Sequence, residues 1–216
     1  HRNISLDKNG HTLLYDGIDS SGIQNSISWS LVRKDVNNFI EPSEGSVVDL
    51  SYKLSGGLLG GNHNFLELKL DMSYYHPLDF ADDFRTYFKL RSLFGFLWKR
   101  DGSQIPEMER YRLGGFDDLR GFPFWSVSPT EKRRRSPYGD YYDYHYGGDK
   151  KMLFQLEYFV PLISQVGLKV LGFADVGQVF SESDSISFKS LKSDVGFGFR
   201  WQTPVAPFRF EWAYPY

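Results

Sequence analysis

The chain has 216 residues, which suits one domain of ordinary size or two small ones. Its 25 basic and 27 acidic side chains leave a net charge of −2, which excludes a generally basic nucleic-acid-binding protein, and the absence of cysteine excludes disulfide scaffolds, thiolate metal sites and cysteine nucleophiles. No run of about 18 apolar residues predicts a transmembrane helix, although a membrane β-barrel needs only short alternating segments.

Alternation of apolar and polar residues with period two, the pattern of a half-buried strand, dominates the chain. Residues 1–23 lack a clear example and do not open with the apolar segment of a signal peptide, so we expect a loop or strand remnant there, in a mature form, a fragment or a cytosolic protein. Residues 24–216 contain the candidate strands, at 24–33, 46–55, 62–76, 84–98, 150–161, 166–180, 193–203 and 206–214.

The candidate strands are long and rich in aromatic residues. Several run ten residues or more, whereas strands of globular proteins usually have about 5–6 and a tilted strand that crosses a bilayer needs about 9–11. Aromatic side chains gather near the strand ends, like an interfacial girdle, at Tyr74, Tyr75, Trp98, Trp201, Trp212 and Tyr214. This pattern favours an all-β fold, an antiparallel transmembrane β-barrel, over the alternative of a soluble antiparallel sandwich or barrel.

The two faces of these strands differ in chemistry, because charged residues occupy mid-strand positions on one face only. In a membrane barrel that face lines a wet lumen and the apolar face contacts lipid. We therefore expect lipid contact at Leu68, Leu70, Phe154 and Leu156. We expect the lumen to be faced by Lys69, Asp71 and Glu157.

The connection 99–149 has about fifty residues without clear alternation, and a loop of that length is usually functional or disordered. The turns at 161–165 and 203–207 are short. Outer-membrane barrels have long extracellular loops and short periplasmic turns, so we expect these segments to lie on those two sides. The part at 132–146 combines four basic residues with five tyrosines. That mixture can bind nucleic acid or anionic lipid headgroups, or it can simply form an exposed loop tip, and its role stays open.

Within this loop lies Leu119-Arg120-Gly121-Phe122, preceded by Gly114-Gly115. The combination resembles the hallmark of the large extracellular loop in the BamA-type family of outer-membrane β-barrel insertases. Other segments resemble further motifs of that family in the right order. They are its hairpin signature at 33–45, its Phe-x-Asp-x-Gly strand motif at 173–177, and two of its last strands at 196–204 and 208–215. Ordered matches over 33–215 are more specific than a lone Arg-Gly-Phe.

The resemblance implies that the chain supplies about eight strands, roughly the eighth to the fifteenth, of a barrel with about sixteen strands in the outer membrane of a Gram-negative bacterium. It implies that the final strand and the N-terminal POTRA modules are absent. It implies a non-enzymatic assembly factor that inserts and folds client β-barrel proteins. The implied partners are unfolded outer-membrane protein clients, accessory lipoproteins of an assembly complex and outer-membrane lipid, without nucleic acid.

Several alternatives remain beside this interpretation. The chain could belong to a related transporter for two-partner secretion or autotransporter assembly, or to a passive pore or esterase-linked barrel. It could also form a closed eight-stranded barrel. The lumen of a barrel that small would be filled with side chains, which leaves no room for a long loop to fold inside.

The resemblance implies that the loop folds back into the lumen and that its arginine contacts acidic residues on the inner wall. The Arg120 guanidinium keeps its charge and presents five donors in a planar fork, so in an enclosed lumen it needs carboxylate partners. Because side chains alternate along a strand, Glu157 and Asp175 should point into the lumen, and we predict that Arg120 binds one or both. The alternative is a solvated loop arginine, and Asp117 and Asp118 could compete for it locally.

The other site candidates surround this contact. They are the turn glycines Gly114 and Gly115, Gly121 at a close backbone approach, Phe122 against the inner wall, and the strand-motif residues Phe173 and Gly177. The histidines show no metal-binding spacing, and no catalytic set, nucleotide-binding loop or cofactor motif is recognisable. The sequence therefore predicts neither an enzyme, a metal site nor a cofactor.

Overall fold

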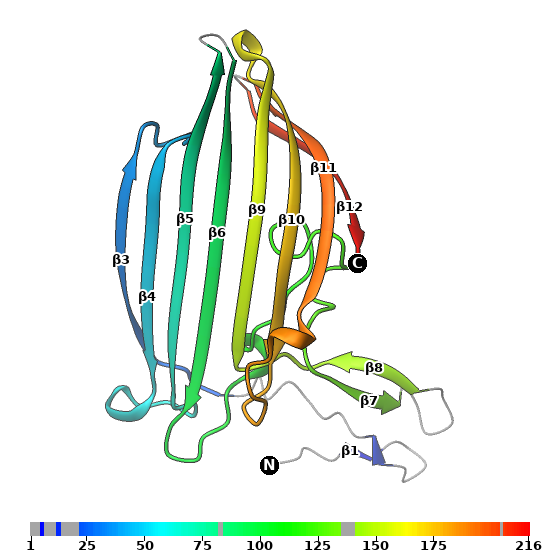
Figure 1. The fold of residues 1–216 in the computed structure, drawn as a ribbon. Coiled ribbons are helices and arrows are strands. Elements are labelled where there is room, and N and C mark those ends of the chain that lie inside the picture. The colour runs from blue at the N-terminus through cyan, green and yellow to red at the C-terminus, as the bar shows by residue number, and fades with distance from the viewer. Residues whose placement is uncertain (1–4, 7–11, 14–21, 82–83, 135–140, 204) are drawn as a thin grey trace.

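Eight long antiparallel strands form one curved sheet, shown in Figure 1. The computed structural model describes residues 5–6, 12–13, 22–81, 84–134, 141–203 and 205–216. The strands of the sheet are β3 (Ser26–Val36), β4 (Gly45–Ser55), β5 (Phe65–Ala81), β6 (Phe84–Lys99), β9 (Lys150–Ile163), β10 (Leu168–Phe180), β11 (Lys192–Gln202) and β12 (Pro207–Pro215). They pair in the order β12-β11-β10-β9-β6-β5-β4-β3, so β12 and β3 are the two edges of an open sheet.

These strands correspond to the eight that the period-two pattern predicts, with ends that differ by a few residues. The remaining elements are short. They are β1 (Ser5–Leu6) paired with β2 (Thr12–Leu13), β7 (Thr130–Arg134) paired with β8 (Tyr141–His145), and the single 3₁₀ turns η1 (Gly57–Leu59), η2 (Glu107–Glu109), η3 (Ser164–Val166) and η4 (Phe188–Ser190). Most of the predicted loop or strand remnant at 1–23 lies outside the described residues. Among those described, no helix is long and apolar enough to cross a membrane.

The outer face of the sheet is built from apolar side chains in register across neighbouring strands. Leu31, Leu50, Leu70 and Phe94 form one such row across β3, β4, β5 and β6. Leu31 keeps 71% of its surface exposed, which would be costly in water but suits contact with lipid. Because strand side chains alternate, Lys69, Asp71 and Glu157 point to the opposite face, as the sequence predicts.

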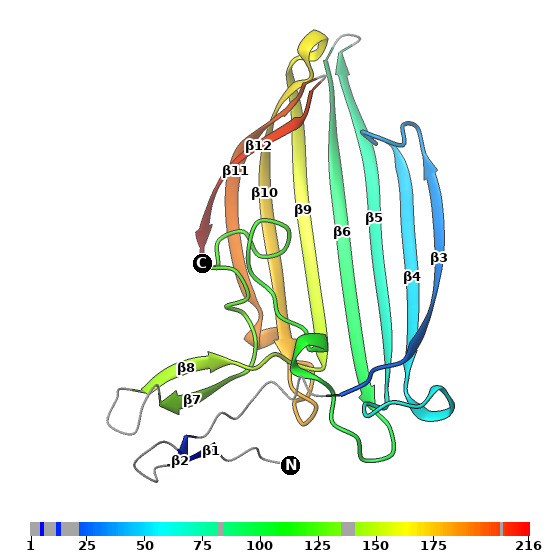
Figure 2. The ribbon, with the colours of Figure 1, turned by 180° about the vertical axis from the view of Figure 1, so that it is seen from behind.

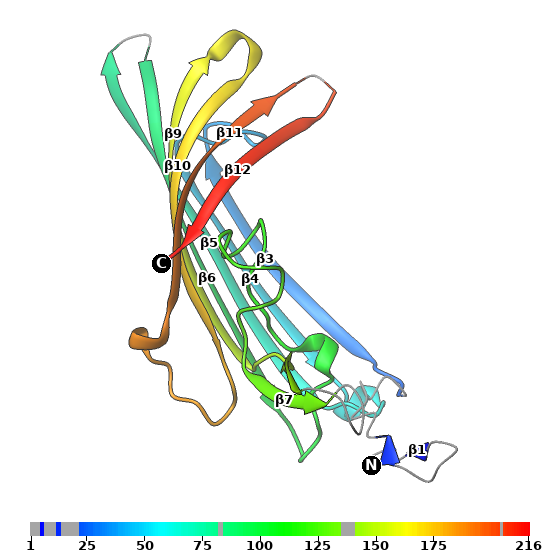
Figure 3. The same cartoon turned by 90° about the vertical axis from the view of Figure 1, so that its right-hand side faces the viewer.

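The connection between β6 and β9 folds back against the concave face of the sheet. Figure 2 shows this segment in front of β9 and β10, and Figure 3 shows it within the trough of the curved sheet. The hairpin of β7 and β8 forms part of the returning arm, an element that the sequence analysis missed. Its strands have five residues each and lack apolar alternation, so the period-two pattern gave no sign of them.

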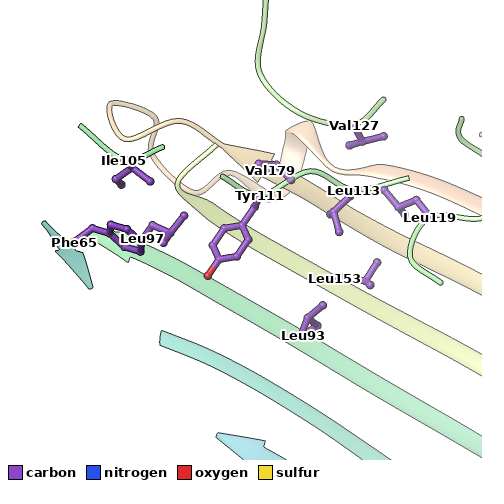
Figure 4. Packing of buried hydrophobic residues seen from close by; sticks show 10 residues of the cluster. All are labelled: Phe65, Leu93, Leu97, Ile105, Tyr111, Leu113, Leu119, Val127, Leu153 and Val179. Carbon is purple, nitrogen blue, oxygen red and sulfur yellow. The ribbon is translucent and has the colours of Figure 1, made fainter. Parts of the chain in front are cut away.

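The buried core lies between this loop and the inner face of the sheet, as Figure 4 shows. Its members are Phe65, Leu93, Leu97, Ile105, Tyr111, Leu113, Leu119, Val127, Leu153 and Val179. The sequence predicts that the inner face lines a water-filled lumen. Part of that face is instead apolar and packs against the loop. Apolar positions lie among the charged ones on the inner face, and the loop packs on several of them, such as Leu93, Leu153 and Val179.

The loop and the short turns lie at opposite ends of the sheet. The turns between β9 and β10 and between β11 and β12 are at the upper end in Figure 1, whereas the 99–149 connection leaves and rejoins the sheet at the lower end. At the upper end, Glu41 in the β3–β4 turn pairs with Lys169 on β10 at 3.1 Å. This ion pair joins strands that lie far apart in the sheet order.

Candidate functional site: the loop-to-wall contact

Arg120 lies at the centre of the contact between the loop and the inner wall. Its Nε donates to Oδ2 of Asp175 at 2.6 Å and its Nη2 donates to Oδ1 at 2.7 Å, so the guanidinium holds this carboxylate with two parallel hydrogen bonds. Its Nη1 donates to Oε1 of Glu157 at 2.8 Å. The guanidinium also lies 3.6 Å from the centroid of the Phe173 ring. Only 2% of the Arg120 side chain is exposed, so the charge is enclosed.

Strand parity places the partners of Arg120 on one face. Asp175 on β10 and Glu157 on β9 occupy inward positions, and the structure brings both residues that the sequence singled out to the same guanidinium. Phe173, two residues before Asp175, shares its face and provides the ring beneath the arginine. Gly177, two residues further along, lies under Leu113 of the loop, where an added Cβ would come within 3.2 Å of the leucine side chain.

Glu211 on β12, which the sequence did not single out, extends the network to the edge of the sheet. Arg120 Nη1 lies 3.4 Å from Glu211 Oε1, and Arg200 Nη2 donates to the same oxygen at 3.0 Å and to Glu157 at 2.7 Å. Lys89 on β6 pairs with the second oxygen of Glu157 at 3.1 Å. Side-chain alternation along β11 and β12 already places Arg200 and Glu211 on the polar face, but it does not say that Arg120 of the loop lies beside Glu211.

Glycines shape the turn that presents Arg120. Gly114 and Gly115 have φ values of 109° and 106°, a region that L-residues with a Cβ rarely adopt. A Cβ on Gly114 would come within 2.3 Å of the Pro123 carbonyl oxygen. Gly121 lies directly against β11, since its Cβ would come within 2.6 Å of Cβ of Asp194. A larger residue at 121 would therefore lift the loop from the wall.

The acidic neighbours of Arg120 do not compete for it. Asp117 pairs with Arg209 on β12 at 3.2 Å, and the Asp118 carbonyl accepts a hydrogen bond from Gln155 at 2.8 Å. Phe122 packs against the core cluster between the loop and the sheet. Both aspartates thus bind the wall beside Arg120 and leave its guanidinium to the buried carboxylates.

The start of the loop is attached to the wall at a separate place. Lys53 on β4 pairs with Glu109 of η2 at 2.7 Å, and the side-chain amide of Gln24 donates to the same carboxylate oxygen at 2.8 Å. Burial alone would raise the pKa of Glu109, but these two hydrogen bonds outweigh it and hold the pKa below its ordinary value. Glu109 is therefore an ionised anchor of the loop base.

The basic, tyrosine-rich part of the loop is partly described. Its Arg133 guanidinium lies 3.6 Å from the Tyr144 ring centroid, and the Tyr144 hydroxyl donates to Glu107 in η2. Residues 135–140 lie outside the described part of the chain. The side chains of Arg133 and Tyr144 thus bind within the loop itself. Within the described ranges, no cluster of His, Asp and Glu could hold a metal ion.

Comparison with known proteins identifies the family. Residues 5–216 match the model of the Omp85 superfamily domain. The chain belongs to the Omp85 superfamily.

Relatives and a solved structure agree with this membership. The outer membrane protein assembly factor BamA of Nitratidesulfovibrio vulgaris is 27% identical over 176 residues, which cover 81% of this chain and 21% of that protein. The sorting and assembly machinery component 50 homolog A of Xenopus laevis is 25% identical over 193 residues, which cover 81% of this chain and 37% of that protein. The crystal structure of Haemophilus ducreyi BamA lacking POTRA domains 1–3 superposes with a TM-score of 0.75 at 21% identity, over 88% of this chain and 38% of that one.

These comparisons confirm the BamA-type resemblance and the fold predicted from the sequence. The described sheet is part of an outer-membrane β-barrel of the Omp85 superfamily, and its relatives are assembly factors rather than enzymes. The soluble sandwich is therefore wrong. The closed eight-stranded barrel is also wrong, since β12 and β3 remain the edges of an open sheet. The chain spans between about a fifth and two fifths of the relatives that it matches.

Proposed function

We propose that residues 24–216 are the C-terminal part of the barrel of an outer-membrane protein assembly factor, which inserts and folds client β-barrel proteins. Its partners in this proposal are unfolded outer-membrane protein clients, outer-membrane lipid and accessory lipoproteins of an assembly complex. Support comes from the Omp85 membership and from relatives that carry the names of assembly factors.

The observation that carries the proposal is the enclosed contact of Arg120 with Asp175 and Glu157. An assembly factor must keep its own barrel intact while a client strand pairs with an exposed strand edge, a mode of recognition that uses backbone hydrogen bonds. The loop-to-wall lock, defined as Arg120, Gly121, Phe122, Glu157 and Asp175, joins β9, β10 and the loop on the inside of the barrel. It therefore braces the wall without occupying an edge.

The lock acts through enclosed charge. Because the guanidinium and the Asp175 carboxylate are almost fully buried, removing the arginine leaves Asp175 without its cationic partner, and such a change typically costs about 3–5 kcal/mol. Gly114 and Gly115 form the turn that sets the arginine, and Phe173 with Gly177 supplies the wall beneath it. The lock thus depends on small residues at fixed places as well as on charge.

Replacement of the protein in its native outer membrane by the Arg120→Ala variant tests the proposal. We expect fewer folded client barrels in the outer membrane, measured as the heat-modifiable fraction of several porins on gels. The matched control is Arg100→Ala, which changes an exposed arginine at the start of the same loop and should leave the clients unchanged. Loss of one secreted polypeptide with normal client barrels would instead identify a two-partner secretion or autotransporter-assembly transporter. Loss of small-solute permeation alone would identify a passive pore.

A further inference from the structure

A glycine on the inner wall lies between two lysines. Gly95 on β6 is the cross-strand partner of Lys69 on β5 and of Lys151 on β9, so the three residues form one row across neighbouring strands. All three point to the face that the loop covers, since side chains on adjacent strands in register share a face. The row therefore has a gap at its centre and an ammonium group on each side.

The ring of Tyr111 from the loop fills this gap. Figure 4 shows Tyr111 reaching from the loop toward the wall, where it keeps 5% of its surface exposed. The Lys151 ammonium lies 4.8 Å from its ring centroid and the Lys69 ammonium 5.8 Å, both within the range of cation–π attraction. A Cβ on Gly95 would come within 2.7 Å of Tyr111 Cζ and 2.9 Å of its hydroxyl oxygen. The ring can occupy this place only above glycine.

The hydroxyl of Tyr111 is also held. It donates to Oε1 of Glu67 at 2.8 Å, and the Lys69 ammonium pairs with the same oxygen at 2.7 Å. Glu67 keeps 5% of its surface exposed, so the acceptor is an enclosed carboxylate. Hydrogen bonds to an ionised acceptor are about twice as strong as neutral ones. Tyr111 is therefore bound through both its ring face and its hydroxyl.

The backbone of Tyr111 ties the two arms of the loop together at this point. Its amide donates to the Gly148 carbonyl at 2.8 Å, and the Gly148 amide donates to the Tyr111 carbonyl at 2.9 Å. The next residue, Asp149, continues into the sheet, because its carbonyl accepts from the Leu97 amide at 2.7 Å. A side chain fixed at Tyr111 thus fixes the place where the loop leaves and re-enters the wall.

We propose that Gly95, Lys69, Lys151 and Glu67 form a socket for Tyr111, and that this tyrosine socket attaches the loop to the wall at a place separate from the Arg120 lock and from the Glu109 anchor. The Arg120 lock lies in a different row of the sheet, in which Asp175 pairs with Gln155 and Gln155 pairs with Arg91 of β6. Arg91 precedes Gly95 by four residues, which is a separation of about 13 Å along the strand. A single contact would let the loop pivot, whereas contacts at separate places on the wall fix its direction. Tyr111 is thus a positioning residue for Arg120, and only its relevance to client assembly rests on the proposed function.

Hydrogen exchange of the whole purified protein in lipid nanodiscs tests the socket. The Tyr111→Phe variant keeps the ring and removes only the hydroxyl, so we expect the amides of 108–118 to exchange about tenfold faster while β9 and β10 keep their protection. Gly95→Ala places a methyl group where the ring lies and should accelerate the same amides at least as much. The matched control is Gly172→Ala on β10, where an added Cβ meets nothing within 4 Å and exchange should not change.

A double substitution separates the socket from a general packing effect. In a Tyr111→Ala background, Gly95→Ala should add less than a twofold change in loop exchange, because the ring that the methyl group would strike is gone. Unchanged loop exchange in Tyr111→Phe would overturn the proposal, even if Gly95→Ala proves too damaged to fold. So would a Gly95→Ala effect that persists undiminished without the ring. Because the readout is loop exchange, either answer stands whether or not the protein assembles clients.

Discussion

Asp175 and Asp194 are cross-strand neighbours on β10 and β11, yet Arg120 binds only the first of them. Asp175 receives two hydrogen bonds from the guanidinium, whereas Asp194 receives none from it and lies against Gly121 of the loop. Both side chains are almost fully buried. The same residue type on adjacent strands thus binds a guanidinium at one position and none at the other.

This asymmetry predicts opposite outcomes for the same substitution. Asp175→Asn removes the charge that Arg120 binds and should destabilise the folded barrel by about 3–5 kcal/mol. Asp194→Asn removes a buried carboxylate that the Arg120 guanidinium does not bind, so it should be neutral or stabilising by about 1 kcal/mol. Urea unfolding of each variant in detergent, monitored by tryptophan fluorescence, measures the change in the free energy of unfolding. Equal destabilisation by the two changes would show that Asp194 has a partner of its own.

Arg120 itself should tolerate neither loss of charge nor loss of shape. Arg120→Ala should destabilise the loop by about 3–5 kcal/mol, and Arg120→Lys should rescue it only in part, because an ammonium cannot bind two carboxylates as a planar fork does. The double variant Arg120→Ala with Asp175→Asn should cost less than the sum of the single changes. Proteolysis of the loop under native conditions measures the free energy of loop opening in each single variant and in the double variant. Strictly additive effects would mean that the two residues act separately.

The two faces of β5 should respond differently to arginine. Leu70→Arg places a charge on the lipid face near the middle of the strand and should cost about 2–4 kcal/mol, whereas Lys69→Arg on the inner face keeps a cation beside Glu67 and should cost less. Unfolding from lipid bilayers in guanidinium chloride measures the difference. Similar costs at the two positions would contradict the assignment of the outer face to lipid.

The loop and the short turns should be reachable from different sides of the outer membrane. The chain has no cysteine, so a single introduced thiol is a specific label. We expect Lys132→Cys in β7 to react with a membrane-impermeant maleimide on intact cells, and Val205→Cys in the exposed β11–β12 turn to react only after the outer membrane is opened. The reverse pattern would invert the proposed topology.

Parity along each strand explains how much of the site could be predicted from the sequence. Asp175 and Glu157 were assigned to the inner face because side chains alternate, and the Leu-Arg-Gly-Phe segment pointed to Arg120 as their partner. Glu211 and Arg200 sit on the same face by the same rule. They were missed as partners because alternation says which face a residue occupies and nothing about the segment that covers it.

The sequence by itself determined the eight strands, the two chemically different faces and the family, since all three depend on local alternation and on short motifs. Only the tertiary structure decided how the loop lies in the trough. Its path places Leu113 and Leu119 on apolar wall positions and brings Tyr111 above Gly95. These contacts join residues far apart in the chain, and a glycine that leaves room for a distant ring looks like any other glycine in the sequence. The physical reason is that close packing depends on the shape of both surfaces at once, whereas a sequence pattern describes one strand at a time.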